Sequence, residues 1–308
     1  MRNGDQREHV RERVKKAAKV MGQVWALGRS KFRKDWSQRI WLFDRLVWSV
    51  ANYGLEIWGW GKREEVESLQ NKYLRWLLGV KRQVPRYMIR EELQREKLRG
   101  KAGMRAWKYE IRLNEGRGDE LARWCWKEIK EKAREGKTIE RWKKKRKEYY
   151  KKMGWSIKEV EEKRLKGELR GKVLIKKDKE MQRKERKEKI IESRFNKFYK
   201  RIKKEGVPEY LKKGWKEERW MRMARFRLGN EIKGYRYWKN EEGRKCRMCG
   251  EKKETWEHVW TECIDWREGR NWEEVVEEIV GEEEKGEEWL KILERTREGM
   301  CMNESMNG

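Results

Sequence analysis

Apolar side chains recur every three or four residues along much of this chain, which is the period of an amphipathic α-helix. Residues 36–53 are apolar nearly all round, and such a helix is expected to be buried among others. Gly28 is expected to end the first helix, and Pro85 suits the first turn of the fourth. The helices predicted in this part of the chain cover 10–27, 36–53, 66–77, 85–98 and 106–113. We therefore expect a helical domain at residues 1–115.

The pattern changes in residues 116–205, which we expect to form a strongly basic helical region or linker. After a helix around residues 121–129, the stretch 127–205 holds 33 Lys plus Arg and 15 Asp plus Glu, a net charge of +18. A long charged helix is predicted to carry an apolar stripe, or seam, near its C-terminal end and to stop at Val207-Pro208. The residues of this seam are Ile191, Phe195, Phe198 and Ile202.

Residues 206–270 combine an arginine-rich helix, predicted over 215–228, with aromatic residues and a cysteine motif. Arginine can bind phosphates and aromatic faces can stack on unpaired bases, but apolar residues at helical spacing equally fit a packed face. Residues 271–308 carry 4 basic and 12 acidic residues, a net charge of −8. We expect this acidic tail to be partly disordered and to fold back on the basic middle of the chain.

The composition supports an all-α fold with a polyanionic partner. The 84 Lys plus Arg exceed the 55 Asp plus Glu by 29, and such a positive field attracts nucleic acid. The 20 Trp residues supply apolar surface that disordered basic chains lack, and only 2 Pro interrupt the helix-forming residues. RNA or DNA is therefore the expected partner, whereas no small-molecule substrate is indicated.

The candidate nucleic-acid-binding residues fall in two places. The run KKKRK could contact phosphates or act as a nuclear-import signal, although a solvated helix face explains it equally well. The second place is the arginine-rich helix with the aromatic residues that follow it. The residues are Lys143, Lys144, Lys145, Arg146, Lys147, Arg219, Arg222, Arg225, Arg227, Tyr235, Tyr237 and Trp238.

Catalytic signatures and membrane segments are both missing from the sequence. Only two histidines occur, and neither accompanies a nucleophile elbow; phosphate-loop and dinucleotide fingerprints are also lacking. The scattered aspartates provide no paired ligands for a two-metal polymerase site. No secretory signal or bilayer-length apolar stretch occurs either. We expect a non-enzymatic intracellular protein without membrane contact, in the nucleus if KKKRK acts as an import signal and otherwise in the cytoplasm.

One motif is specific. Cys246, Cys249, His258 and Cys263 follow the spacing C-x-x-C, eight residues, H, four residues, C. Zinc in structural sites is bound by a closed tetrahedral set of thiolates and imidazoles, and three thiolates with one histidine leave no position open for substrate. The motif predicts structural Zn²⁺. Cys125 is expected to be a small buried hydrophobe and Cys301 a free thiol in the tail.

Several blocks resemble the C-terminal part of the polyproteins of non-LTR (LINE-type, jockey-like) retrotransposons. These are RIWLFDRLVWSVANYGLEIWGW (residues 39–60), LQNKYLRWLLGVKRQVPRYMIREELQREKLRGKAGMRAW (69–107), RFRLGNEIKGYRYW (225–238) and CRMCGEKKETWEHVWTEC (246–263). The resemblance extends over about residues 8–270. In that family a helical thumb, a basic helical region and a Cys-Cys-His-Cys zinc motif follow an endonuclease and a reverse transcriptase palm.

The resemblance assigns residues 8–80 to the thumb and the four metal-ligand candidates to the family's zinc motif. The palm's paired aspartates have no counterpart in this chain, so it would lack polymerase activity of its own. The resemblance thus implies a nucleic-acid-binding fragment of a reverse transcriptase, with element RNA or a palm-bearing polymerase chain as further partners. The alternative is a zinc-stabilised helical scaffold or interaction protein that binds polyanions without specificity.

Overall fold

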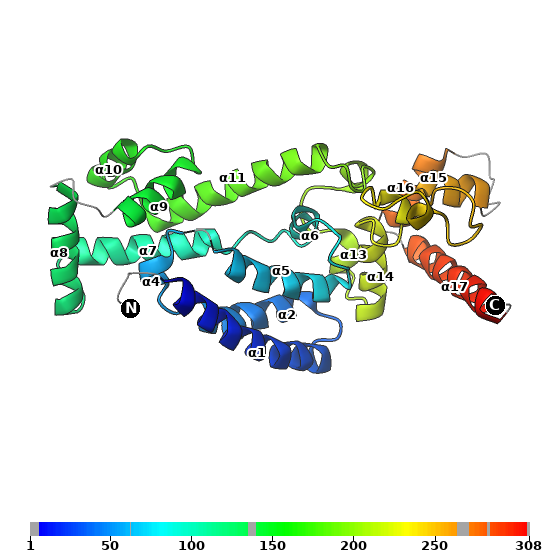
Figure 1. The fold of residues 1–308 in the computed structure, drawn as a ribbon, viewed down its shortest axis with the longest axis horizontal. Helices are drawn as coiled ribbons and strands as arrows, with labels where there is room; N and C mark the ends of the chain where they lie inside the picture. Colours follow the sequence, from blue (N-terminus) through cyan, green and yellow to red (C-terminus); the bar gives the residue numbers. More distant parts are fainter. Residues whose placement is uncertain (1–5, 62, 135–139, 264–270, 282–283, 307–308) are drawn as a thin grey trace. The chain divides into compact units, whose positions relative to one another are not determined.

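The computed structural model describes residues 6–61, 63–134, 140–263, 271–281 and 284–306 (Figure 1). Within these residues the chain consists of helices and connecting loops, with one isolated antiparallel bridge between Lys245 and Lys253. The prediction of an all-α fold is therefore confirmed. None of the described helices combines the length and the apolar character that crossing a bilayer requires.

The chain divides into two compact units, and each unit combines segments that are distant in sequence. Unit 1 comprises Met1–Trp25, Trp41–Gln70 and Glu96–Glu185, and unit 2 comprises Ala26–Ile40, Asn71–Arg95 and Arg186–Gly308. The predicted boundaries near residues 115, 205 and 270 do not coincide with the limits of these units. The predicted boundaries treat each domain as one continuous stretch of sequence. Each compact unit instead combines separate stretches that pack together.

Unit 1 contains complete helices and parts of helices that it shares with unit 2. Parts of α1 (Arg7–Lys31), α2 (Trp36–Leu42), α5 (Glu64–Leu78) and α11 (Gly171–Ile191) belong to it. Its complete helices are η1 (Phe43–Val47, a π-helix), α3 (Trp48–Ala51), α4 (Leu55–Trp58), α7 (Arg99–Asn114), α8 (Glu120–Arg134), α9 (Glu140–Lys151) and α10 (Ile157–Leu165).

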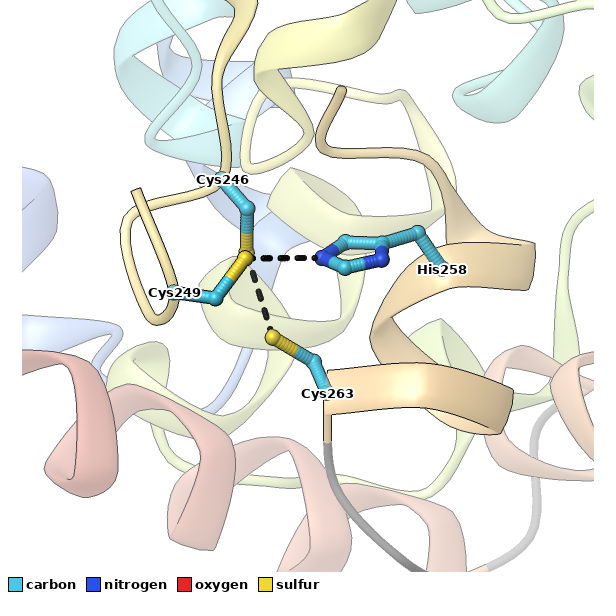
Figure 2. A group of neighbouring side chains, drawn as sticks. All are labelled: Cys246, Cys249, His258 and Cys263. Atoms are coloured by element: carbon cyan, nitrogen blue, oxygen red, sulfur yellow. Dashed lines mark hydrogen bonds between the residues drawn. The ribbon is translucent and has the colours of Figure 1, made fainter. Parts of the chain in front are cut away.

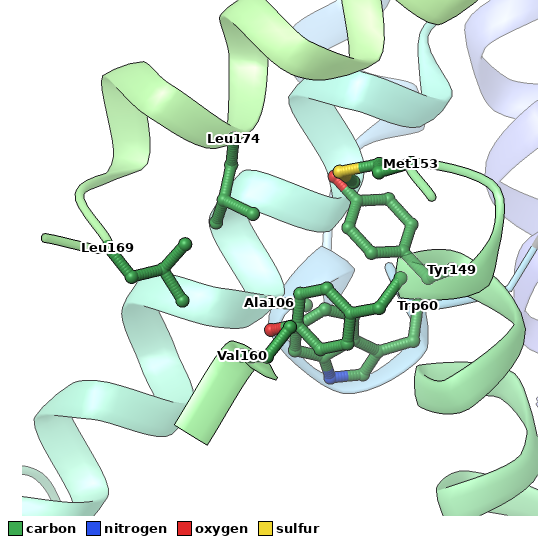
Figure 3. Close-up of a cluster of buried hydrophobic side chains, with 8 residues drawn as sticks. Trp60, Ala106, Tyr149, Met153, Val160, Leu169 and Leu174 are labelled. Carbon is green, nitrogen blue, oxygen red and sulfur yellow. The ribbon is translucent and has the colours of Figure 1, made fainter. Parts of the chain in front are cut away.

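An aromatic cluster forms a core of unit 1 (Figure 3). The ring of Trp60 meets the ring of Tyr149 edge-on at 5.3 Å between centroids, and the Tyr150 ring lies 5.4 Å from Trp60. Tyr149 packs so closely on α7 that a Cβ added at Gly103 would lie 2.1 Å from its ring. The rest of the buried cluster is aliphatic: Ala106, Met153, Val160, Leu169 and Leu174.

Unit 2 contains the chain's C-terminal third and the ends of the shared helices. A π-helix, η4 (Val259–Cys263), directly follows α15 (Trp256–His258). The other complete elements are α6 (Arg86–Glu92), α12 (Tyr199–Ile202), α13 (Glu209–Lys212), α14 (Glu217–Arg227), the 3₁₀ turns η2 (Lys233–Tyr235) and η3 (Glu242–Arg244), α16 (Trp272–Val280) and α17 (Glu284–Met306).

The structure corrects two predicted helix ends. Helix α1 continues past Gly28 to Lys31, because a single glycine weakens a helix without necessarily ending it. The predicted seam helix through Ile202 is wrong, since α11 ends at Ile191 and a turn precedes α12. Asn196 in this turn has a φ of 46°, a left-handed conformation that interrupts a right-handed helix.

Two helices, α16 and α17, occupy the segment predicted to be a partly disordered acidic tail. Val276 and Val280 on α16, and Leu290 and Leu293 on α17, are completely buried. This burial of apolar side chains stabilises the two helices despite the high density of glutamates around them.

Candidate metal centre and nucleic-acid interface

The four side chains of the cysteine-histidine motif converge in unit 2 (Figure 2). Their ligand atoms all lie within 4.8 Å of one another. The Cys246 and Cys263 Sγ atoms are 3.6 Å apart, and Cys249 Sγ lies 3.3 Å from His258 Nε2. A zinc tetrahedron requires edges of about 3.8 Å between sulfurs and about 3.5 Å from sulfur to nitrogen. The four donors therefore fit zinc in both chemistry and spacing.

A tight turn positions the two cysteines of C-x-x-C. The Cys246 amide donates to Lys252 O at 2.7 Å, and the Gly250 amide donates to Cys246 O at 3.0 Å. Gly250 has a φ of 72°, which glycine adopts without strain. The Met248 amide donates to Cys246 Sγ at 3.4 Å, which fixes the position of this sulfur in the turn.

A π-helix brings His258 and Cys263 onto one side of their helix. Residues five apart on an α-helix point about 140° away from each other, because each residue turns the chain by about 100°. The wider turn of η4 reduces this separation. Thr255 begins the helix, since its Oγ1 accepts a hydrogen bond from the His258 amide at 3.1 Å.

Glu262 orients the histidine. Its carboxylate lies 2.7 Å from His258 Nδ1 and 3.0 Å from Lys252 Nζ. A proton on Nδ1 donated to this carboxylate leaves the Nε2 lone pair directed at the sulfurs, which is the tautomer a metal needs. Sequence reasoning missed Glu262, although its position four residues after His258, about one helical turn, was a signal for it.

The thiols have unequal acidities. Burial acts to raise the pKa of Cys249, but hydrogen bonds from the backbone of Lys252 and Glu251 and from neighbouring side chains lower it to about 6. Burial and the adjacent Cys246 and Cys249 raise the pKa of Cys263 far above its usual value. Neighbouring thiolates repel one another, and a bound divalent cation relieves this repulsion.

A buried carboxylate connects the metal-binding loop to α17. Glu254 is completely buried and accepts hydrogen bonds from Arg247 Nη2 at 2.8 Å and from Arg297 Nη2 at 3.3 Å. Arg247 stands between the two cysteines of C-x-x-C, and the Lys233 amide also donates to Glu254 at 3.1 Å. The loop is thus fixed to the protein interior independently of the ligands.

The KKKRK run lies on α9 in unit 1 and contains both exposed and buried side chains. Lys143, Lys144 and Lys147 are exposed and Lys145 is half-buried. Arg146 is buried and forms a bidentate ion pair with Glu110, at 3.0 Å from Nε and 2.9 Å from Nη2. Arg146 therefore attaches α9 to α7, whereas the side chains of the three lysines are exposed.

Three arginines of α14 pair with acidic residues of α17. Arg219 Nε lies 3.0 Å from Glu287, and the Nε of Arg222 lies 2.6 Å from Glu294. Arg225 Nη2 is 2.5 Å from the same Glu294. The acidic tail thus folds onto this arginine-rich helix.

Arg227 has no access to an external phosphate. It is completely buried, and its Nε donates to Glu92 Oε1 at 2.6 Å. The expectation that it contacts nucleic acid is therefore wrong for this conformation, because an interior carboxylate already neutralises it. Helical spacing was an available signal for this burial, because Arg227 follows the buried Trp220 by seven residues and the buried Met223 by four.

The three aromatic residues after α14 differ in exposure. Tyr235 is half-buried, and burial raises the pKa of its hydroxyl far above the usual range. Tyr237 and Trp238 are 50% and 47% exposed. Only these two present their rings to solvent in the way that a base-stacking residue must.

The structure tests one of the two remaining cysteine predictions. Cys125 is exposed on α8, so the expectation of a buried small hydrophobe is wrong. Trp126, the next residue but one after Trp124 on the same helix, is buried instead. The side chain of Cys301 lies outside the described residues.

A further basic surface on α11 was not singled out from the sequence. Lys172, Lys176, Lys179 and Arg183 are exposed, whereas Leu174, Asp178 and Gln182 are buried. The basic residues follow one another at spacings of four, three and four, which places them along one face of the helix. This spacing was the available signal.

A scan of protein-family models, a search of curated proteins and a search of solved structures each return no match to this chain.

Proposed function

We propose that this chain binds nucleic acid through the exposed basic face of α11, with the cysteine-histidine centre as a structural zinc site. The observation that carries this proposal is the division of α11 into two faces. One face is anchored in unit 1 and the opposite one presents Lys172, Lys176, Lys179 and Arg183 to solvent.

The buried face of α11 fixes the direction of these lysines. Asp178 is 3% exposed and pairs with Arg99 Nε at 3.1 Å. The Arg99 guanidinium also reaches Glu185 at 3.1 Å, and the Lys97 amide donates to Gln182 at 2.6 Å. These contacts hold α11 in one rotational position, so its basic residues form a row about 16 Å long.

Such a row matches a phosphate backbone better than it matches a compact anion. Each lysine that neutralises a phosphate releases condensed counterions, and affinity then falls steeply with salt. Backbone contacts of this kind do not read sequence and do not separate RNA from DNA. The exposed lysines of α9 would extend the same class of contact.

The zinc centre has a structural role in this proposal. Three cysteines and one histidine would hold the ion in a closed set, and the ion would supply folding energy to the C-terminal part of unit 2. The resemblance to the thumb and zinc region of retrotransposon reverse transcriptases accords with this arrangement. We propose that the chain corresponds to that region, is not a polymerase by itself, and works with element RNA or a palm-bearing chain.

The second candidate function is a zinc-stabilised helical scaffold. It is favoured by one observation, namely that Arg219, Arg222 and Arg225 are already occupied by glutamates of α17. In that case the net charge of +29 would attract any polyanion without a defined surface.

Binding to a labelled single-stranded RNA and a DNA duplex across a salt series separates the two functions. The test variant is Lys172→Gln/Lys176→Gln/Lys179→Gln, and a charge-matched control replaces the exposed Lys15, Lys19 and Lys31 in α1. The α11 variant is expected to lower the salt slope for single strands by about two. The control is expected to change it much less. Equal effects of both triple variants, or a slope near zero for the unmodified chain, would overturn the proposal.

A further inference from the structure

We propose that Tyr237 and Trp238 form a platform on which unpaired bases of a single-stranded nucleic acid stack. This inference rests on the proposed function and adds to it a site for bases, in unit 2, that is distinct from the phosphate-binding row of α11. The platform consists of Tyr237, Trp238, Phe195 and Arg194.

Trp238 stacks on a buried ring and is nearly half exposed. Its ring stacks on Phe195 with 5.9 Å between centroids and an interplanar angle of 18°. Phe195 is 3% exposed, so it belongs to the protein interior, whereas Trp238 is 47% exposed. A nearly parallel stack on a buried ring fixes the orientation of the indole and reduces the entropy that ligand binding would cost.

Tyr237 adds a second ring and a cation. Its ring lies 5.1 Å from that of Trp238 at an interplanar angle of 83°, so the two rings form a corner. The guanidinium of the exposed Arg194 lies 5.0 Å from the Tyr237 ring centroid. An arginine in this position can stack beside a base and reach the phosphate next to it.

The loop beneath the platform is held in one conformation. The Ser193 hydroxyl donates to Phe195 O at 2.6 Å and accepts from the Tyr87 hydroxyl at 2.7 Å. Asn196, with a φ of 46° and 1% exposure, donates from Nδ2 to Arg227 O at 2.8 Å. These bonds join the loop to α14 and preorganise Phe195 under Trp238.

Gly229 allows this close approach. A Cβ at Gly229 would lie 2.8 Å from the Cβ of Asn196, and its φ of 72° is itself one that glycine favours. The same glycine ends α14, since the Asn230 amide donates to Arg225 O at 2.8 Å. The loop that contains Asn196 and the end of α14 are thereby held in close contact.

The sequence around the rings is mainly basic. The segments SRFNKF (residues 193–198) and KGYRYWKN (233–240) carry five basic residues, and the exposed Glu192 and Glu241 flank them. Lys197 and Lys239 are exposed beside Phe195 and Trp238 in the sequence. Aromatic faces with surrounding cations suit bases joined by phosphates, whereas the stacked bases of a duplex are not available to such faces.

The test compares oligonucleotides that differ only in their bases. The zinc-loaded full chain is titrated with labelled dT12 and with an abasic 12-mer that carries the same phosphates. Base stacking predicts tighter binding of dT12, and Trp238→Ala should weaken dT12 binding by roughly 5- to 150-fold while leaving the abasic strand nearly unchanged. Arg194→Met should reduce the same preference to a smaller extent.

The control variant is Trp124→Ala, which removes a tryptophan that is 61% exposed on α8 of unit 1. It should bind both strands as the unmodified chain does. Equal affinity of the unmodified chain for dT12 and for the abasic strand would overturn the platform while leaving the proposed function intact. Failure to bind either strand would overturn the proposed function itself. If Trp238→Ala keeps the full preference for dT12, the bases bind at another place and the platform is overturned.

Discussion

The guanidinium of Arg227 and the carboxylate of Glu92 form an ion pair in the interior of unit 2, although 135 residues separate them in the sequence. The Tyr199 hydroxyl donates to the second oxygen of Glu92 at 2.7 Å, and Arg227 Nη1 donates to Val280 O. The buried charges are therefore both paired and hydrogen-bonded, the condition under which such a pair is tolerated.

Removing one member of this pair should strongly destabilise the fold. Arg227→Met leaves the Glu92 carboxylate buried without its cation, and the free energy of unfolding should fall by about 3 to 5 kcal/mol. Urea unfolding with saturating zinc measures the loss. The double variant Arg227→Met/Glu92→Met should lose less than the sum of the two single losses, because it leaves no unpaired charge. The control is Arg201→Met, which removes a more exposed ion pair with Glu277; a loss no larger than in this control would contradict the account.

Glu262→Gln should weaken metal binding without removing a ligand. The amide cannot accept the Nδ1 proton of His258 as strongly as the carboxylate does, so the affinity for Zn²⁺ should fall about 10- to 100-fold. Competition with a chromophoric chelator measures the affinity, and the visible spectrum of the Co²⁺ form reports whether four ligands remain. Glu257→Gln, which changes an exposed glutamate one residue before the histidine, is the matched control. If both variants bind zinc equally well, Glu262 has no part in orienting the imidazole.

Much of the local structure could be predicted from periodicity and spacing. The cysteine-histidine set was found from its spacing alone, because zinc requires these donors close together wherever they fall in the fold. The helical segments were found from the period of apolar residues. Neither signal depends on which segments pack together.

The remaining features depend on tertiary contacts. Arg219, Arg222 and Arg227 all lie on α14, but only the packed structure shows that Glu287 pairs with the first two and Glu92 with the third. The break at Asn196 was missed because the apolar spacing of four and three residues continues through the turn. No local pattern reveals that Asn196 must lie against Gly229, which follows it by 33 positions.

Two glycines should respond in opposite directions to a methyl group. A Cβ at Gly59 would lie 2.5 Å from Ala102 O on α7, so Gly59→Ala must push α4 away from α7 and should cost about 1 to 3 kcal/mol. Gly22 is exposed within α1 and has no atom within 4 Å of its Cβ position, so Gly22→Ala should stabilise the protein by about 0.5 to 1 kcal/mol. Thermal unfolding of both variants decides the point; a stabilised Gly59→Ala would mean that the two helices are not in close contact.

Acid should weaken unit 2 through Glu91. Burial acts to raise the pKa of this carboxyl, but Lys203 Nζ and Arg186 Nε, each 2.9 Å away, lower it below its usual value of 4.5. A carboxyl whose pKa is lower in the folded state stabilises the protein fully above the unfolded pKa, and this contribution is lost as the pH falls through the folded pKa. Glu91→Gln should thus be less stable at pH 7 and should lose less stability than the unmodified chain between pH 5 and pH 3.

The measurement is urea unfolding of the zinc-loaded chain at several pH values, and each variant is compared with the unmodified chain so that acid-induced zinc release affects both equally. Glu188→Gln serves as the control, because Glu188 is exposed on α11. Its pH dependence should match that of the unmodified chain. A Glu91→Gln variant with the same loss of stability between pH 5 and pH 3 as the unmodified chain would show that Lys203 and Arg186 do not favour the ionised carboxylate, and the acid sensitivity would then have to come from other buried carboxylates.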